Sequence, residues 1–138
     1  SRTGEGLYRS MQSAFNQANL TANDIDYISA HGTATPYNDE MESKALNLAR
    51  LQAKPVNSLK AYFGHTLGAA GVLESIVAIR NLRDQKILKS LGYAKHGVPL
   101  PLKVVKETRE WPIKNVLKTA SGFGGCNAAV IFSNRSRR

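Results

Sequence analysis

The 138-residue sequence predicts one α/β unit. Short apolar segments alternate with segments whose apolar residues recur at helical spacing, which is typical of strands connected through helices. The chain then closes with two apolar segments joined by the glycine-rich string "SGFGGCN", which indicates a β-hairpin. A chain of this length can bury roughly two thirds of its unfolded surface, so it can form a real core.

The first part of the chain predicts a helix, a turn and a strand. Leu7, Met11 and Phe15 lie at helical spacing, so we expect an amphipathic helix over residues 4–18. The string "TAND" predicts a turn, and residues 25–30 predict a short buried strand.

A loop, "HGTATPYNDE", leads into the second predicted helix. Asn38 or Asp39 can cap this helix, whose first turn is rich in acidic residues, as the helix dipole favours. We expect the helix over "DEMESKALNLARL". One face of it carries Met41, Ala45, Leu48 and Ala49.

The remaining elements follow in the same alternation. A short strand is expected around residues 56–58, followed by a glycine-rich turn. Residues 69–82, "AAGVLESIVAIRNL", are apolar on nearly every side, which predicts a helix buried on most sides. Residues 92–111 predict a loop region, and residues 115–133 predict a strand, a glycine hairpin and a strand.

Composition limits the class of protein. The hydrophobic share of 42% and the charged share of 21% are ordinary for a soluble globular protein. No apolar run approaches the roughly 18 residues that span a bilayer, and the N-terminus lacks a secretory signal, so we expect no membrane association. The single cysteine, Cys126, agrees with a reducing cytosol, and we expect a cytoplasmic protein. Because the chain does not begin with Met, we interpret it as a fragment.

The net charge of +9 is unevenly distributed. Residues 86–118 carry eight Lys or Arg against two Glu, whereas residues 1–42 are acidic. This basic region fits either a solvated face or a surface for an acidic protein. No nucleic-acid-binding motif accompanies the charge, so we rank nucleic acid low as a partner.

Three glycine-containing loops each follow a short apolar strand: "SAHGTATP", "NSLKAYFGHTLGAAG" and "SGFGGCNAA". Ligands collect outside the carboxyl ends of strands in α/β sheets, so these loops could converge on one site. They carry His31, Lys60, His65 and Phe123. Taken singly, each residue also fits an ordinary capping, surface or core position. The sequence contains neither a GxGxxG nor a GxxxxGK[ST] phosphate loop.

The context of His65 favours acid–base or oxyanion chemistry. Glycines on either side permit close backbone approach, and a helix start can keep a nearby imidazole neutral. A neutral histidine that donates from Nε2 is suited to stabilising an oxyanion. Two histidines with Asp39 and Glu42 could also ligate zinc, but no HxxxH, HExxH or Cys–His spacing is present. We therefore expect no metal and no cofactor.

Together the three loops resemble the C-terminal half of the β-ketoacyl-(acyl carrier protein) synthases. "HGTATPYNDEMES" is similar to the family segment HGT-x-T-x-x-x-D-x-x-E, and "KAYFGHTLGAAG" to K-x-x-x-G-H-x-x-G-A-A-G. "SGFGGCNA" is similar to G-F-G-G-x-N-A. The resemblance implies a thiolase-like fold, of which residues 1–134 form the C-terminal half: a mixed sheet with flanking helices and a closing hairpin. Residues 135–138 are expected to be a disordered basic tail.

The resemblance also implies roles for the polar residues. His31 and His65 would be the two active-site histidines, which bind the malonyl carbonyl and stabilise the enolate. Lys60 would pair with Glu42 to position the histidine loops. The same network would include Asp39, Thr33 and Thr35. Glu74 matches a family glutamate near a structural cation or a loop contact, although an ordinary helix residue fits equally well.

The hairpin turn would hold a gate. Phe123, flanked by Gly122, Gly124 and Gly125, would swing to admit the extender unit, or else simply pack in the core. Ser121 departs from the family where a second phenylalanine is common, and Cys126 stands where threonine is common. The nucleophilic cysteine of the family lies in the other half, so Cys126 is interpreted as a small buried residue.

The activity implied by the resemblance is a decarboxylating Claisen condensation, catalysed by an acyltransferase of fatty acid or polyketide synthesis. Its partners would be acyl carrier protein, malonyl and acyl thioesters and the N-terminal half, in a homodimer when full length. The chain alone would be inactive. The alternative is a non-condensing partner subunit that sets chain length or specificity, and retention of both histidines argues against it.

Overall fold

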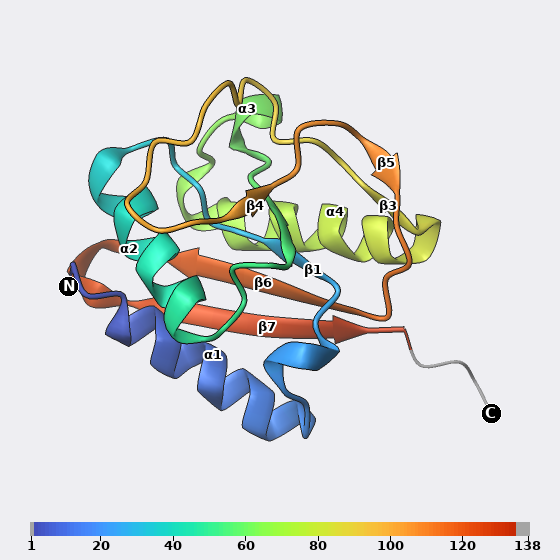
Figure 1. The fold of residues 1–138 in the computed structure, drawn as a ribbon, viewed down its shortest axis with the longest axis horizontal. Helices are drawn as coiled ribbons and strands as arrows, with labels where there is room; N and C mark the ends of the chain where they lie inside the picture. Colours follow the sequence, from blue (N-terminus) through green and yellow to red (C-terminus); the bar gives the residue numbers. More distant parts are fainter. Residues whose placement is uncertain (1, 135–138) are drawn as a thin grey trace.

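A five-stranded mixed sheet forms the centre of the computed structural model, which describes residues 2–134 (Figure 1). The strand order is β4-β2-β1-β6-β7, and every neighbouring pair except β6 and β7 is parallel. The strands are β1 (Tyr27–Ser29), β2 (Pro55–Asn57), β4 (Lys103–Val104), β6 (Asn115–Ser121) and β7 (Asn127–Ser133). The predicted α/β class and closing hairpin are confirmed, whereas the predicted basic tail lies outside the described residues.

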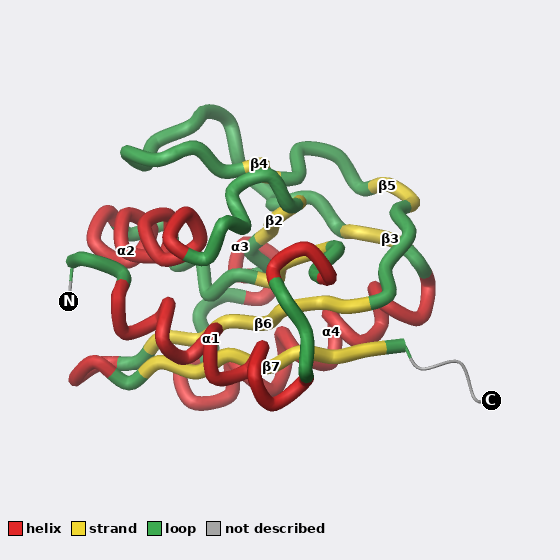
Figure 2. Tube along the Cα trace, turned by 60° about the horizontal axis from the view of Figure 1, so that its bottom comes forward, coloured by secondary structure: helices red, strands yellow, loops and turns green. Residues whose placement is uncertain are grey.

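Helices cover both faces of this sheet (Figure 2). They are α1 (Glu5–Ala18), α2 (Pro36–Leu48), the short α3 (Lys60–Phe63) and α4 (Ala70–Asp84). Single 3-10 turns cover Ala22–Asp24, Leu67–Ala69 and Phe123–Gly125, and a separate ribbon pairs β3 (Lys86–Ile87) with β5 (Arg109–Glu110). The predicted loop over residues 92–111 therefore contains two short strands, β4 and β5.

Two cores lie on opposite faces of the sheet. The predicted helical stripe of α1 packs with α2 against Ile28 and Leu117. On the other face, α4 packs against Tyr27 and Val116. Successive side chains of a strand point to opposite faces. In β1 and in β6, therefore, one of two adjacent residues packs in the first core and the other packs in the second.

Gly4 lets α1 and α2 approach closely. Its φ is +76°, a conformation that favours glycine, and a Cβ there would lie 2.6 Å from the backbone nitrogen of Ala45 in α2. The two helices can therefore share one core above β1.

Helix α2 differs from the prediction in its start and in its buried face. It begins at Pro36 with Thr35 as N-cap, so neither Asn38 nor Asp39 caps it. Proline at the first helical position has the required φ and lacks an amide that would need a partner, which explains the earlier start. The helix turns Glu42 and Leu46 inward and leaves Leu48 exposed.

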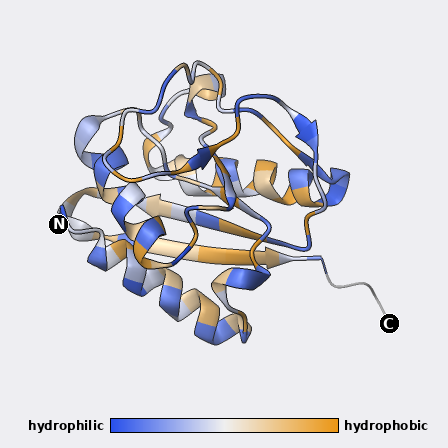
Figure 3. Ribbon diagram, viewed as in Figure 1, coloured by the Kyte–Doolittle hydropathy of each residue, from blue (hydrophilic) through white to orange (hydrophobic). Residues whose placement is uncertain are grey.

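Helix α4 is buried on one side only, so the prediction of burial on most sides is wrong for this chain. Ala70, Glu74 and Ala78 face inward. The outward residues are apolar, and we call them the α4 apolar face: Val72, Leu73, Ile76 and Ile79 (Figure 3). Within residues 2–134, no helix combines the length and the apolar character that crossing a membrane requires.

Candidate active site

Three loops meet at one edge of the sheet. β1 runs parallel to both neighbours, with Ser29 opposite Asn57 of β2 and opposite Lys118 of β6. The carboxyl ends of these strands therefore lie together, as the sequence predicts. The loop after β1 carries His31, α3 and the turn after it carry Lys60 and His65, and the hairpin turn carries Phe123.

The first two loops are joined directly. The Ser58 hydroxyl donates to the Gly32 carbonyl at 2.6 Å. Gly32 has a φ of +48°, and a Cβ on it would lie 2.4 Å from the Ser58 Cβ. Only glycine allows this approach, so the "HG" pair holds the His31 loop against the loop after β2.

Glu42 holds the backbone around His31. Its two carboxylate oxygens accept from the amides of His31 at 2.8 Å and Gly32 at 2.6 Å. The side chains of Asn38 and Thr119 also donate to Glu42, at 2.8 Å and 3.3 Å. Both oxygens of this buried carboxylate therefore accept hydrogen bonds. These bonds fix the position of the backbone from which the His31 side chain extends.

Lys60 pairs with Glu74, not with Glu42 as predicted. The Lys60 Nζ lies 2.6 Å from Glu74 Oε1, and the lysine is only 9% exposed. The prediction is wrong because backbone amides already occupy Glu42, while α4 brings Glu74 beneath α3. Glu74 is 0% exposed, so a buried cation partner is what its charge requires.

A second buried lysine completes this cluster, and the sequence analysis missed it. The Lys118 Nζ lies 2.5 Å from Glu74 Oε2 and donates to the carbonyls of Ser29 and Ala30 at 3.3 Å and 3.1 Å. Burial lowers the pKa of Lys118, and the Glu74 carboxylate opposes that shift. The available signal was a lysine within a strand whose neighbours on both sides are apolar or small.

The ring of His31 has a defined neutral tautomer. The Lys60 Nζ lies 3.2 Å from His31 Nδ1 and also donates to the His31 carbonyl. An ammonium has only protons to offer, so Nδ1 is the acceptor and the ring proton lies on Nε2. Burial lowers the pKa of His31 to about 4, and the Lys60 charge adds to that effect.

His65 is arranged in the same way. The Leu67 backbone amide donates to His65 Nδ1 at 3.1 Å, which places the ring proton of the neutral form on Nε2. The ring centroids of His31 and His65 are 5.2 Å apart, with an interplanar angle of 84°. Two imidazoles with Nδ1 occupied can therefore present two Nε2–H donors within one small region.

The other predicted network residues lie beside this pair. The hydroxyls of Thr33 and Thr35 are 2.7 Å apart. Burial raises the pKa of Asp39, whose carboxylate accepts from Asn38 at 3.2 Å. Asp39 thus joins the network through Asn38, which also bonds Glu42.

The hairpin turn is open in this chain. Phe123 is 100% exposed, and Gly124 and Gly125 both have positive φ. The alternative that Phe123 packs in the core therefore does not hold for this chain. Cys126 is exposed, so its prediction as a small buried residue is wrong.

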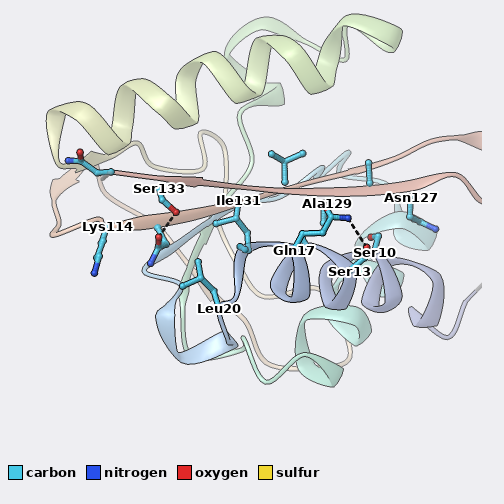
Figure 4. Close-up of a pocket in the computed structure, with 15 residues that line it drawn as sticks. Ser10, Ser13, Gln17, Leu20, Lys114, Asn127, Ala129, Ile131 and Ser133 are labelled. Carbon is cyan, nitrogen blue, oxygen red and sulfur yellow. Dashed lines mark hydrogen bonds between the residues drawn. The ribbon is translucent and has the colours of Figure 1, made fainter. Parts of the chain in front are cut away.

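Two hollows mark the surface. One, of about 750 Å³, lies beside the histidine site; its lining includes Thr33, Asp39, Lys60, His65 and the loop 90–98. The other, of about 1240 Å³, is a groove between α1 and β7 (Figure 4). Lys114 is the one titratable side chain among the groove's described lining residues, so the groove lacks an acid–base pair.

Within residues 2–134, no three His, Cys, Asp or Glu side chains are placed to hold a metal ion. The donors near the histidine site are instead two ammonium groups, which compete with a cation for the carboxylates. The arrangement is that of a site for a developing negative charge.

Comparison with known proteins identifies relatives of the whole chain. Residues 1–94 match the family model "Beta-ketoacyl synthase, C-terminal domain". A putative polyketide β-ketoacyl synthase 1 of Streptomyces halstedii is 33% identical over 99% of this chain, and a 3-oxoacyl-[acyl-carrier-protein] synthase 2 of Staphylococcus aureus is 35% identical over 94%. The chain spans 33% of the length of each, about one third.

Solved structures give the same result for the fold. A β-ketoacyl synthase from Burkholderia phymatum STM815 superposes with a TM-score of 0.92 at 35% identity, over 97% of this chain and 33% of the other. The ishigamide ketosynthase/chain length factor superposes with a TM-score of 0.91 at 30% identity. This match covers 97% of this chain and 34% of the other. AntDE:AntF, a type II PKS acyl-carrier protein in complex with its ketosynthase, superposes with a TM-score of 0.93 at 28% identity. This match covers 99% of this chain and 34% of the other. The expected thiolase-like C-terminal half is confirmed.

The His31 ring is predicted to stay neutral well below pH 6. Its pKa of about 4 lies under the ordinary 6.5, so the unfolded chain takes up this proton first and folded stability falls as pH drops from 6.5 toward 4. An NMR titration of ¹⁵N-histidine-labelled protein should show His31 protonating near pH 4. The Lys60→Met variant should titrate higher, because a nearby positive charge is lost. A wild-type midpoint near 6.5 would contradict this geometry.

Proposed function

Since this chain belongs to the β-ketoacyl synthase family, as its C-terminal domain, we propose that it supplies the two-histidine half of a condensing active site. The reaction is the decarboxylating condensation of an acyl thioester with malonyl-acyl carrier protein, giving 3-oxoacyl-acyl carrier protein. The enzyme class is acyltransferase, in fatty acid or polyketide synthesis.

One observation supports this proposal most strongly: the two Nε2–H donors of His31 and His65. A malonyl thioester whose carbonyl oxygen lies between them meets two preorganised donors. As CO2 leaves, negative charge develops on that oxygen, and both hydrogen bonds strengthen. Nδ1 of each ring is held by Lys60 or by the Leu67 amide, so the donors need not reorient as charge develops.

The chemistry balances without an external acid or oxidant. The bond between the malonyl carboxylate carbon and the methylene carbon breaks, CO2 departs, and the electron pair becomes the enolate. The enolate carbon then attacks the acyl thioester carbonyl, forming a C–C bond and expelling the thiolate. Covalent transfer of the acyl group to a cysteine beforehand divides the reaction into two easier steps.

That cysteine is proposed to lie outside this chain. Cys126, the one cysteine of the sequence, is exposed on the hairpin turn. The exposed His65 and the α4 apolar face form a surface that the N-terminal half of the protein would cover, with the whole forming a homodimer. Phe123, on the glycine turn from Gly122 to Gly125, would gate the entry of the extender unit.

The alternative is a partner subunit that sets chain length without condensing. One structural neighbour is a ketosynthase/chain length factor, which makes this class relevant. The paired histidine donors favour the enzyme, because a non-condensing subunit has no need to orient both.

Decarboxylation should depend on both histidines in the intact protein. His31→Ala and His65→Ala should each lower malonyl-thioester decarboxylation by roughly 10²-fold or more, since each removes one oxyanion donor. Arg9→Ala, exposed on α1 and away from the hollow beside the histidines, is the control and should keep activity. Release of CO2 is measured directly. Full decarboxylation in both site variants would contradict the role given to the histidines, and a wild-type protein without decarboxylation would favour the partner-subunit alternative. Condensation by the 138-residue chain alone would contradict an external nucleophile.

A basic surface is proposed to bind the acidic carrier protein. Lys86, Lys89 and Lys95 are all exposed. Reversing these three charges to Glu should weaken carrier-protein binding and reduce its dependence on salt, because such contacts are electrostatic and screened. Titration calorimetry at two salt concentrations measures this. A control with equal charge change uses Arg9 on α1, Lys44 on α2 and Lys54 immediately before β2. Equal weakening in both triple variants would show only an effect of net charge.

A further inference from the structure

Lys118 has no assigned role in the proposed chemistry, yet it lies deep in the site. It is 3% exposed and comes from the middle of β6. Its ammonium contacts Glu74 Oε2 and the carbonyls of Ser29 and Ala30, the two residues that precede His31. Lysine is rarely buried to this extent unless it is paired, so we expect Lys118 to have a specific partner and a specific role.

The buried charges are balanced only when Lys118 is counted. Besides the neutral His31 ring, four groups that carry charge are buried together: Glu42, Glu74, Lys60 and Lys118. Glu74 divides its two oxygens between the lysines, with Oε1 on Lys60 and Oε2 on Lys118. Without Lys118, both carboxylate oxygens of Glu74 could attract the Lys60 ammonium. That ammonium is the group that contacts His31 Nδ1.

We propose that Lys118 is a positioning residue for His31. It occupies one oxygen of Glu74 so that the other directs Lys60 toward His31 Nδ1, and it ties the end of β1 to β6 through two carbonyls. Lys118 thereby selects the Nε2–H tautomer of His31. The expected effect on activity rests on the proposed function, whereas the effect on the tautomer does not.

The charged groups around His31 determine how the loss of Lys118 changes the pKa of His31. Lys60 faces the ring from α3, Glu74 from α4, Lys118 from β6, and His65 from the turn after α3. Glu42, from α2, contacts the His31 backbone amide. Removing Lys118 removes one positive charge and leaves Glu74 less neutralised, and both changes favour a protonated ring. The pKa of His31 should therefore rise toward its ordinary value.

The test compares Lys118→Met with Lys114→Met in the intact protein. Lys114 is an exposed lysine immediately before β6, so its variant controls for loss of a charge near the same strand. ¹⁵N NMR of labelled histidine reports the tautomer and titration of His31. Lys118→Met should mix the two tautomers, raise the titration midpoint and, because the Nε2–H donor is then misplaced, lower decarboxylation by up to about 100-fold. Lys114→Met should match wild type in every respect.

A purely structural role for Lys118 would lower thermal stability while leaving the tautomer and midpoint of His31 unchanged, and that result overturns the proposal. The two proposals fail separately. A wild-type protein without decarboxylation, in which Lys118→Met still changes the His31 signals, would refute the proposed function and support this inference.

A second background keeps the test decisive if Lys118→Met does not fold. Glu74→Gln leaves two buried ammonium groups beside a neutral amide. Adding Lys118→Met there removes a surplus charge, so the double variant should melt at a higher temperature than Glu74→Gln alone. The His31 midpoint should also rise between these two proteins. A lower melting temperature, or an unchanged His31 midpoint, would overturn the proposal.

Discussion

Glu74 is the constraint on which the site depends. Its carboxylate is wholly buried at the interface of α4 with the sheet, and each oxygen meets one lysine. A buried charge is costly unless it is paired, so α4, α3 and β6 must hold one relative arrangement for the cluster to be stable. That arrangement brings Lys60 to His31 Nδ1. The orientation of the imidazole donor therefore follows from how a helix and a strand share one carboxylate.

Glu42 and Glu74 divide the work of holding His31. Glu42 accepts from the backbone amides of His31 and Gly32 and so fixes the loop. Glu74 acts through Lys60 on the ring itself. One carboxylate places the residue and the other orients its side chain, while burial keeps the ring neutral. Under the proposed function, donors that are already oriented need little reorganisation as charge develops on a bound thioester oxygen.

Much of this fold follows from local sequence patterns. The α1 stripe, the closing hairpin and the three glycine loops are each visible in a few residues, and parallel pairing of β1 with β2 and β6 brings those loops together. The partner of Lys60 could not be predicted in this way. To predict whether Lys60 pairs with Glu42 or with Glu74, one must know which carboxylate already accepts hydrogen bonds from backbone amides. That depends on tertiary contacts.

Helix α4 and Lys118 also differ from the sequence-based expectation, for physical reasons. An apolar pattern on all sides of α4 predicts that the helix is covered but does not say by what, and in this chain one side is left exposed. Lys118 was overlooked because a lysine in a strand usually faces solvent, whereas both faces of β6 are covered here. A charged residue in a strand whose neighbours are apolar or small is the signal that would have identified it.

The free energy of unfolding of Glu74→Gln, measured in denaturant on the intact protein, tests whether Glu74 holds the site together. The comparison variant is Glu40→Gln, which breaks the partly exposed pair with Lys44. Loss of the buried partner should cost about 3–5 kcal/mol, because two buried ammonium groups lose their counter-charge. Loss of the surface pair should cost about 1 kcal/mol or less. Equal, small costs for both variants would contradict the account of Glu74 as the residue that holds the site together.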